Sequence, residues 1–303
     1  MVDPKPTHII LTTDFSEAAA NAYPYAVALA RHYGAKLTLL HTMAIHSEHL
    51  DGAHAVDVSE PYLDTIEADS LKKLTAVDIG DTSGLNVTRK VARASSAAAG
   101  IIAYAAESHA DMVVISSHGR RVIGQVLLGS VTRAVIAESP CPVLCVKKGE
   151  SGLIDPGSGA LRMRRLLVPS DLSEHSRCSL HQAIALARDF KATLHLLNVV
   201  HFDIPESIFL PPGRPSVLTL DTEMRQRVLD HFQSWKSEAE AAGLSVTVAV
   251  EDGAPPKEIA RYADTHDIDL IVLCRRGNPD TPHFLGGVAL RLLHETHRPM
   301  LVV

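Results

Sequence analysis

The chain of 303 residues is 46% hydrophobic and 21% charged, the proportions of an ordinary globular protein, which excludes intrinsic disorder over most of its length. Its formal net charge of −6 argues against general binding to the phosphate backbone of nucleic acids. No apolar run approaches the roughly 18–20 residues that span a bilayer, and Met1 to Thr7 carry no apolar segment of a signal peptide. We therefore expect a cytoplasmic protein with neither nucleic acid nor a membrane as partner.

Short apolar runs alternate with helical patterns along the first half of the chain. Pro24 should kink the first helix, and Gly34 should close it as a C-cap. Strands separated by helices imply right-handed parallel crossovers, and therefore a doubly wound, mostly parallel sheet of five strands. In chain order we expect a strand at 9–13, a helix at 16–31, a strand at 36–41, a helix at 61–79, a strand at 86–92, a helix at 97–108, a strand at 112–116, a helix at 130–138 and a strand at 143–147.

The second half of the chain repeats the first at a constant spacing. The segment from His8 to Glu17 reappears as Arg165 to Glu174, so that equivalent residues lie 157 positions apart (171 − 14). Chance similarity does not keep one spacing over several separate blocks, so we interpret the chain as a tandem duplication. Between the copies, residues 147–163 have the Gly, Pro and Ser content of a flexible connector. We assign domain 1 to 1–148, a linker to 149–163 and domain 2 to 164–303.

The four cysteines are Cys141, Cys145, Cys178 and Cys274, and no two of them form a CxxC pair. Four cysteines in a chain of this length are not a disulfide framework. The sequence therefore predicts that all four are buried structural thiols.

The loop after the fourth strand has the composition of a phosphate-binding turn. Ligands of doubly wound sheets lie beyond the carboxyl ends of the strands. Gly119 allows a close backbone approach there, and Gly129 and Ser130 open the following helix. With Ser130 as N-cap, the free first-turn amides and the positive end of the helix dipole favour an anion. An ordinary glycine turn before a capped helix is the alternative, and neither GxxxxGK[ST] nor GxGxxG is present.

These blocks resemble the universal stress protein family, over essentially the whole chain as two copies. The family's nucleotide signature, G-x2-G-x9-G-[ST], falls on Ser116, Gly119, Gly129 and Ser130, with Ser116 in place of the first glycine. The remaining likeness is carried by Thr12-Thr-Asp-Phe-Ser16, Ser117-His-Gly119, Leu127-Leu-Gly-Ser-Val131 and Ser139-Pro-Cys-Pro-Val-Leu144. The resemblance implies two tandem Rossmann-like domains of the adenine nucleotide alpha hydrolase-like type.

The resemblance also implies an adenine-nucleotide pocket in copy one, with ATP as ligand, with or without Mg²⁺. It implies that the final strands of the copies, 143–147 and 299–303, pair in a pseudo-dimer within the chain, and a homodimer remains open. By the same likeness, Thr12 and Asp14 meet ribose and adenine, Thr42 and Ile115 line the base, Ser116 begins the loop, and Gly119, Gly129, Ser130, Val131 and Thr132 hold the phosphates.

Copy two departs from the signature. Asp171 is retained, but eight residues rather than nine separate Gly277 from Gly286 (286 − 277 − 1), and Gly287 replaces the hydroxyl residue. We expect weak or no ATP binding in copy two, which then serves as partner to copy one. The alternative is that both copies bind nucleotide through altered contacts.

The function that follows is that of a nucleotide-dependent sensor or adaptor in the stress response. A slow ATPase or phosphotransferase that uses His118 or Ser130 is one alternative, and an adaptor with empty pockets is another; we assign no catalytic residue. The histidines at 41, 46, 49 and 54 match no zinc-site spacing. Solvated histidines and a metal site are both compatible with this cluster, and we assign no metal ligand.

Overall fold

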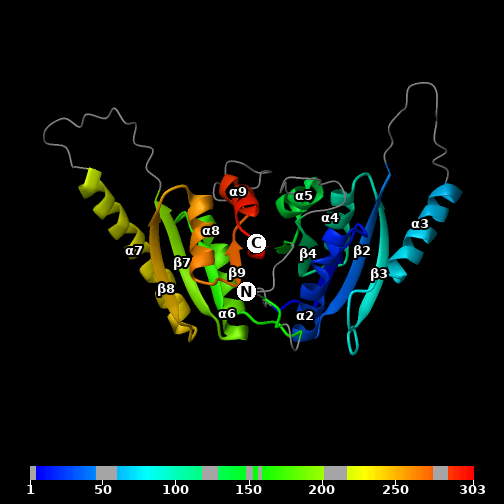
Figure 1. Ribbon diagram of the computed structural model, residues 1–303, viewed down its shortest axis with the longest axis horizontal. Coiled ribbons are helices and arrows are strands. Elements are labelled where there is room, and N and C mark those ends of the chain that lie inside the picture. The colour runs from blue at the N-terminus through cyan, green and yellow to red at the C-terminus, as the bar shows by residue number, and fades with distance from the viewer. Residues whose placement is uncertain are drawn as a thin grey trace, which may run out of the picture. The chain divides into compact units, whose positions relative to one another are not determined.

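The computed structural model describes residues 5–45, 60–117, 129–147, 153–155, 159–200, 217–275 and 286–303. They form two compact units, unit 1 (Met1–Leu161) and unit 2 (Arg162–Val303), each an alternation of strands and helices (Figure 1). None of the described helices combines the length and apolarity that a membrane span requires.

Unit 1 contains a parallel sheet with the strand order β3-β2-β1-β4-β5. The crossovers through α2 and α3 run in one direction across this sheet, and those through α4 and α5 run in the other. Right-handed crossovers therefore place the two pairs of helices on opposite faces. The elements are β1 (His8–Thr12), α1 (Glu17–Ala20), α2 (Tyr23–Tyr33), β2 (Lys36–Ala44), α3 (Glu60–Thr75), β3 (Val87–Ala94), α4 (Ala97–Glu107), β4 (Met112–Ser116), α5 (Ser130–Glu138) and β5 (Val143–Val146).

Unit 2 repeats this topology, with the parallel order β10-β9-β6-β7-β8. The predicted fold class, two tandem Rossmann-like domains with five-stranded sheets, is confirmed. The elements are β6 (Arg165–Pro169), the 3₁₀ turn η1 (Glu174–Ser176), α6 (Arg177–Phe190), β7 (Thr193–Val200), α7 (Val217–Ala241), β8 (Val246–Asp252), α8 (Pro255–Thr265), β9 (Leu270–Leu273), α9 (Gly287–Glu295) and β10 (Met300–Val302).

Burial follows strand position in both units. The central strands β1 and β4 are buried at every residue, and β9 likewise, because helices cover both faces of a parallel sheet. The edge strands β3 and β8 are mostly half-exposed. The core of each unit therefore lies around the two strands between which the order of connection reverses.

The first predicted helix is divided in the structure. Residues 16–31 form α1 and then α2, with Pro24 in the first turn of α2, where its missing amide costs no hydrogen bond. Gly34 closes α2 in the left-handed conformation, with φ of 65°, as expected.

The described part of the expected linker carries more structure than its composition indicates. Ile154 and Leu161 form an antiparallel bridge, and the side chains of Leu153 and Met163 are buried. This segment therefore packs apolar side chains where the sequence predicts a flexible connector.

The prediction of four buried thiols is correct for Cys141 and Cys145 and wrong for the other two cysteines. Cys178, exposed in the first turn of α6, forms a disulfide with Cys274, which follows β9; their Cα atoms are 6.2 Å apart. The partners are 96 positions apart, so only the fold brings them together. By contrast, burial raises the pKa of the Cys145 thiol to about 12, which keeps it protonated and unreactive.

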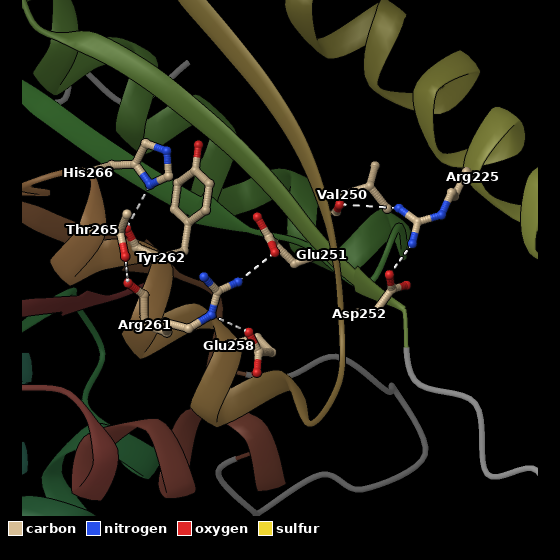
Figure 2. A network of polar contacts seen from close by, with 9 residues as sticks. All are labelled: Arg225, Val250, Glu251, Asp252, Glu258, Arg261, Tyr262, Thr265 and His266. Atoms are coloured by element: carbon tan, nitrogen blue, oxygen red, sulfur yellow. Dashed lines mark hydrogen bonds and ion pairs between the residues drawn. The ribbon is translucent and has the colours of Figure 1, made fainter.

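Two arginines hold the end of the edge strand β8 from its two faces (Figure 2). Successive strand residues point to opposite sides, so Glu251 faces α8 and Asp252 faces α7. Arg261 of α8 donates to Glu251 at 2.6 Å, and Arg225 of α7 forms an ion pair with Asp252. Such exposed pairs each contribute about 0–1 kcal/mol, so they position the strand end more than they stabilise it.

Both copies retain an aspartate directly before their fourth strand, β4 in unit 1 and β9 in unit 2. This aspartate holds the start of the first strand of its unit. In unit 1, Asp111 Oδ2 accepts hydrogen bonds from the amides of Thr7 and His8 at 2.7 and 2.9 Å. In unit 2, Asp269 Oδ2 accepts from the amides of Arg164 and Arg165 at 2.6 and 3.0 Å. Burial would raise the pKa of Asp111, but the hydrogen bonds from Thr7 and His8 outweigh it and lower that pKa.

We expect Asp111→Ala to lower the free energy of unfolding of unit 1 by about 1–2 kcal/mol, and Asp269→Ala to lower that of unit 2 by about 1–3 kcal/mol. Trp235, the single tryptophan, is buried in unit 2, so its fluorescence reports the unfolding of that unit. The urea midpoint measured by this fluorescence should shift for Asp269→Ala and not for Asp111→Ala. Circular dichroism should detect both changes. The exposed Asp69→Ala of α3 is the control.

The lowered pKa of Asp111 gives this effect a defined pH dependence. The stabilisation is fully present above about pH 4, the ordinary aspartate pKa, and is lost as the pH falls through the lower folded value. The difference between wild type and Asp111→Ala should therefore shrink in acid. A difference that grows as the pH falls would contradict the assignment.

Candidate functional site

The carboxyl edge of the sheet in unit 1 brings the predicted site segments together. Strand β1 pairs with β2 on one side, where Thr12 lies opposite Leu40, and with β4 on the other, where Leu11 lies opposite Val114. The candidate residues Thr12, Asp14, Thr42, Ile115 and Ser116 all lie on these three strands or directly after them. A crevice at this edge is expected where the crossovers from neighbouring strands leave toward opposite faces.

The start of α5 is fastened to the end of β4. The amide of Gly129 donates to Ser117 O at 2.9 Å, and the hydroxyl of Thr132 donates to Ser116 O at 2.9 Å. The helix begins at Ser130 with Gly129 as its N-cap, so the predicted capping by the Ser130 side chain is wrong. The cap position is non-helical, with φ of −59° and ψ of 140°, and glycine occupies it without a side-chain bond. Ser130 is exposed, Val131 half-buried and Thr132 buried.

A turn directly after β1 orients the carboxylate of Asp14. Its Oδ1 accepts hydrogen bonds from the amide of Ser16 at 3.0 Å and from the Ser16 hydroxyl at 2.5 Å. Phe15 takes the left-handed conformation, with φ of 64°, and its amide donates to the Thr13 hydroxyl at 3.0 Å. The same turn recurs in unit 2, where Leu172 has φ of 65° and Asp171 Oδ1 accepts from Ser173 at 3.0 and 2.6 Å. The duplication thus preserved a rare backbone shape along with the aspartate.

Three residues around this turn, Thr13, Tyr23 and His41, have no role assigned to them in the sequence-based site. His41, counted there with the histidine cluster, donates from Nδ1 to Thr13 O at 2.9 Å, and its ring lies 4.3 Å from that of Phe15. Tyr23 shares a hydrogen bond of 2.6 Å with the Thr13 hydroxyl. Burial raises the pKa of Tyr23 despite that bond. The hydroxyl repeated at Thr13 and Ser170 was the available sequence signal, since it supports the turn in both copies.

Thr42 of β2 packs tightly against α4. A Cβ added at Gly100 would lie 2.3 Å from Thr42 Cγ2 and 3.0 Å from Ala94 Cβ, so only glycine fits beneath this side chain. The Thr42 hydroxyl is buried, and it has no hydrogen-bond partner among the described residues. A buried hydroxyl without a partner costs about 1–3 kcal/mol, which a ligand could recover.

Several candidates lie outside the described residues. Of the signature positions this applies to Gly119, and of the alternative catalytic groups to His118. His46, His49 and His54 are likewise not described, and within the described ranges no group of three or more His, Cys, Asp or Glu side chains could hold a metal ion.

In unit 2, the copies of the candidate residues converge on a cavity of about 410 Å³. It opens at the carboxyl ends of β6, β7 and β9 and at the start of α9. Its described lining is Pro169, Ser170, Asp171, Ser176, Leu197, Asn198, Val199, Pro255, Ile259, Leu273, Cys274, Gly286, Gly287, Val288, Ala289 and Leu292. Nine of these are the counterparts of candidate residues: Pro169 of Thr12, Asp171 of Asp14, Val199 of Thr42, Leu273 of Ile115, Cys274 of Ser116, Gly286 of Gly129, Gly287 of Ser130, Val288 of Val131 and Ala289 of Thr132.

The profile of the universal stress protein family matches the chain twice, at 6–147 and 163–303. A universal stress protein of Methanocaldococcus jannaschii is 28% identical over 141 residues, which cover 46% of this chain and 81% of that protein. A second one from the same organism is 41% identical over 152 residues, covering 46% of this chain and 94% of its own.

Two solved structures are similar over nearly the whole length. A functionally unknown protein from Pseudomonas aeruginosa has a TM-score of 0.64 at 17% identity, covering 99% of this chain and 93% of its own. A universal stress protein from Archaeoglobus fulgidus has a TM-score of 0.62 at 20% identity, covering 97% and 95%. At these identities the likeness is one of fold.

The contact between Thr42 and Gly100 can be tested by substitution. Gly→Ala inside a helix ordinarily stabilises by about 0.5–1 kcal/mol, whereas overpacking costs about 1–3 kcal/mol. We expect Gly100→Ala to destabilise unit 1 by about 1–2 kcal/mol in urea unfolding followed by circular dichroism. Thr42→Ser removes Cγ2, so the double variant should recover most of the loss. A Gly100→Ala variant as stable as wild type would show that Thr42 does not press on α4.

Proposed function

The chain belongs to the universal stress protein family, and we propose that its unit 1 binds an adenine nucleotide, ATP in the first instance, as the input of a stress-response sensor or adaptor. The proposal rests on one observation above all: segments that carry the likeness to the family, inside and outside its nucleotide signature, meet at one edge of the sheet. They are the end of β1, the end of β4 and the exposed first turn of α5, which is fastened to β4 by Gly129 and Thr132.

The described residues fit such a ligand in three ways. The Thr42 hydroxyl is buried with no partner in the described part of unit 1, and it would gain one from a polar ring. The carboxylate of Asp14 is held by Ser16 and suits the hydroxyls of a ribose. The first-turn amides of α5 have no partners within their helix, and Ser130 stands exposed beside them, which suits phosphate oxygens.

Each residue would then have a limited task. Thr42 and Ile115 would border the base, Asp14 would orient the sugar, and the amides from Ser130 onward would hold the phosphates. Bound ATP would bring a polyanion whose charge the helix dipole partly balances, and Mg²⁺ would reduce it further. The Thr132 hydroxyl already donates its hydrogen to Ser116 O, so Thr132 would hold the start of α5 against the end of β4.

The division into domains at 1–148 and 164–303 with a linker between, and the pairing of the two final strands in a pseudo-dimer, belong to the same proposal. We further propose that unit 2 does not bind ATP well, since Gly287 and Ala289 offer no hydroxyl where unit 1 has Ser130 and Thr132.

Calorimetric titration with ATP tests the site through a matched pair of variants. Aspartate in the first turn of a helix favours the fold but repels phosphate. We therefore expect Ser130→Asp to weaken ATP binding at least ten-fold while its affinity for adenosine changes little. Gly287→Asp, the same change at the same position of unit 2, should leave ATP binding as in wild type, with about one ATP per chain.

Equal losses in the two variants, two equivalent sites per chain, or no heat with ATP would each contradict the proposal. Phosphate release measured on the same samples distinguishes a sensor from an enzyme. We expect binding without steady turnover; turnover that Ser130→Asp abolishes would instead identify a slow ATPase.

A further inference from the structure

We propose that the cavity of unit 2 binds an uncharged, mainly apolar ring compound that carries a hydrogen-bond donor, and that the accessible Cys178–Cys274 disulfide holds the cavity in its binding shape. This inference goes beyond nucleotide binding by unit 1 and does not depend on it.

The cavity has the size of a small-molecule site but few groups that would hold a phosphate. Its volume of about 410 Å³ lies within the range of ligand pockets. Where unit 1 presents Thr42, unit 2 presents Val199, and where unit 1 presents Ser130, unit 2 presents Gly287. Leu273 and Val288 continue the apolar surface. Apolar walls reward a ligand that brings apolar area out of water.

The electrostatics of the cavity also disfavour an anion. Among the described residues that line it, Asp171 is the one with a formal charge, and that charge is negative. Its carboxylate is fixed by Ser173, as Asp14 is by Ser16 in unit 1, so it cannot easily turn away. The start of α9 lines this cavity as the start of α5 does in unit 1, but Gly287 and Ala289 offer an anion no hydroxyl to offset the charge of Asp171, whereas an N–H or O–H donor would meet an acceptor.

Asn198 supplies a second acceptor. Its side chain is 8% exposed, and its Nδ2 donates to Ser170 O at 2.9 Å. Asn198 lines the cavity, and within the described part of the chain its Oδ1 accepts no hydrogen bond. The equivalent residue of unit 1, His41, instead packs its ring at a tilt against Phe15, with the ring centroids 4.3 Å apart. The smaller amide of unit 2 offers an acceptor to a ligand where unit 1 has two aromatic rings in contact.

The disulfide joins two walls of this cavity. Cys274 lines the cavity directly after β9, and Cys178 lies in the first turn of α6, two residues after Ser176, which also lines the cavity. Ser176 is tied to the β6 end by a hydrogen bond of 2.8 Å to Ser170. The cross-link therefore holds the β6–α6 connection against β9, and a site fixed in its bound shape binds more tightly than one that must be ordered.

The chemistry of the bond is a thiol–disulfide exchange with a small-molecule disulfide as oxidant. The thiolate of one cysteine attacks the oxidant and releases one small-molecule thiol, leaving a mixed disulfide. The thiolate of the other cysteine then attacks this bond, forms Cys178–Cys274 and releases a second thiol. Two electrons pass to the oxidant, and the two protons end on the released thiols. Because Cys178 is exposed, small thiols can reach the bond in either direction.

The test uses two dyes that share one ring system, neutral N-phenylnaphthylamine and anionic anilinonaphthalene sulfonate, in fluorescence titrations of the full chain. We expect the neutral dye to bind at least ten-fold more tightly. A Cβ at Gly287 would meet nothing within 4 Å, so the Gly287→Trp variant should fold. Its indole should fill the cavity and lower the affinity for the neutral dye at least ten-fold. Ser130→Trp, the matched change in unit 1, should leave that dye unaffected.

Reduction tests the second part of the proposal. Dithiothreitol should lower the affinity of the wild-type chain for the neutral dye at least five-fold. The Cys178→Ser variant should show this lower affinity with or without reductant. Preference for the anionic dye, or loss of binding in Ser130→Trp but not in Gly287→Trp, would overturn the ligand assignment. Equal affinity for the neutral dye before and after reduction would overturn the role of the disulfide. None of these outcomes depends on whether unit 1 binds ATP.

Discussion

Pairing of one central strand with parallel neighbours on both sides is the constraint from which the geometry of each unit follows. Strand β1 is held between β2 and β4, so its backbone groups are used and the chain must leave at the carboxyl edge. The crossovers from β1 and β4 then depart toward opposite faces, and the turn after β1 faces the start of α5. At the other end of β1, Asp111 fixes the residue at which the strand begins. The position of β1 along the sheet is therefore set at both of its ends.

The duplication separates the residues that build this framework from those that give a crevice its chemistry. Asp111 and Asp269 hold the first strand in both copies, and the left-handed turn recurs at Phe15 and Leu172. Several positions that we propose to face a ligand changed instead, as at Ser130, where unit 2 has Gly287. A side chain with a backbone partner is costly to replace, whereas one directed at a cavity can change with little cost to folding.

Sequence patterns predicted the strands along the chain and a doubly wound parallel sheet, because buried parallel strands have an apolar signature and helices separate them. They also named the segments that meet at the site, since topology alone brings carboxyl ends to one edge. They missed the contact of His41 with Phe15, because a histidine in a histidine-rich stretch carries no periodic signal. They missed the pairing of Cys178 with Cys274, which lie 96 positions apart in the sequence although their Cα atoms are 6.2 Å apart. The predicted cap at Ser130 failed because Gly129 took that position.

Two units of one topology, with different residues at the carboxyl edges of their sheets, give the chain two separate ways to be stabilised. Each unit has its own buried central strands, so ligand binding in one crevice stabilises the unit that contains it. A ligand at one hundred times its dissociation constant adds about 2.7 kcal/mol, a sizeable share of the stability of a domain. The cross-link at Cys178 acts on the same unit as its neighbouring cavity, so redox state and ligand bear on one folding equilibrium. Under the two proposals, unit 1 would respond to a charged nucleotide, and unit 2 to an apolar compound and to oxidation.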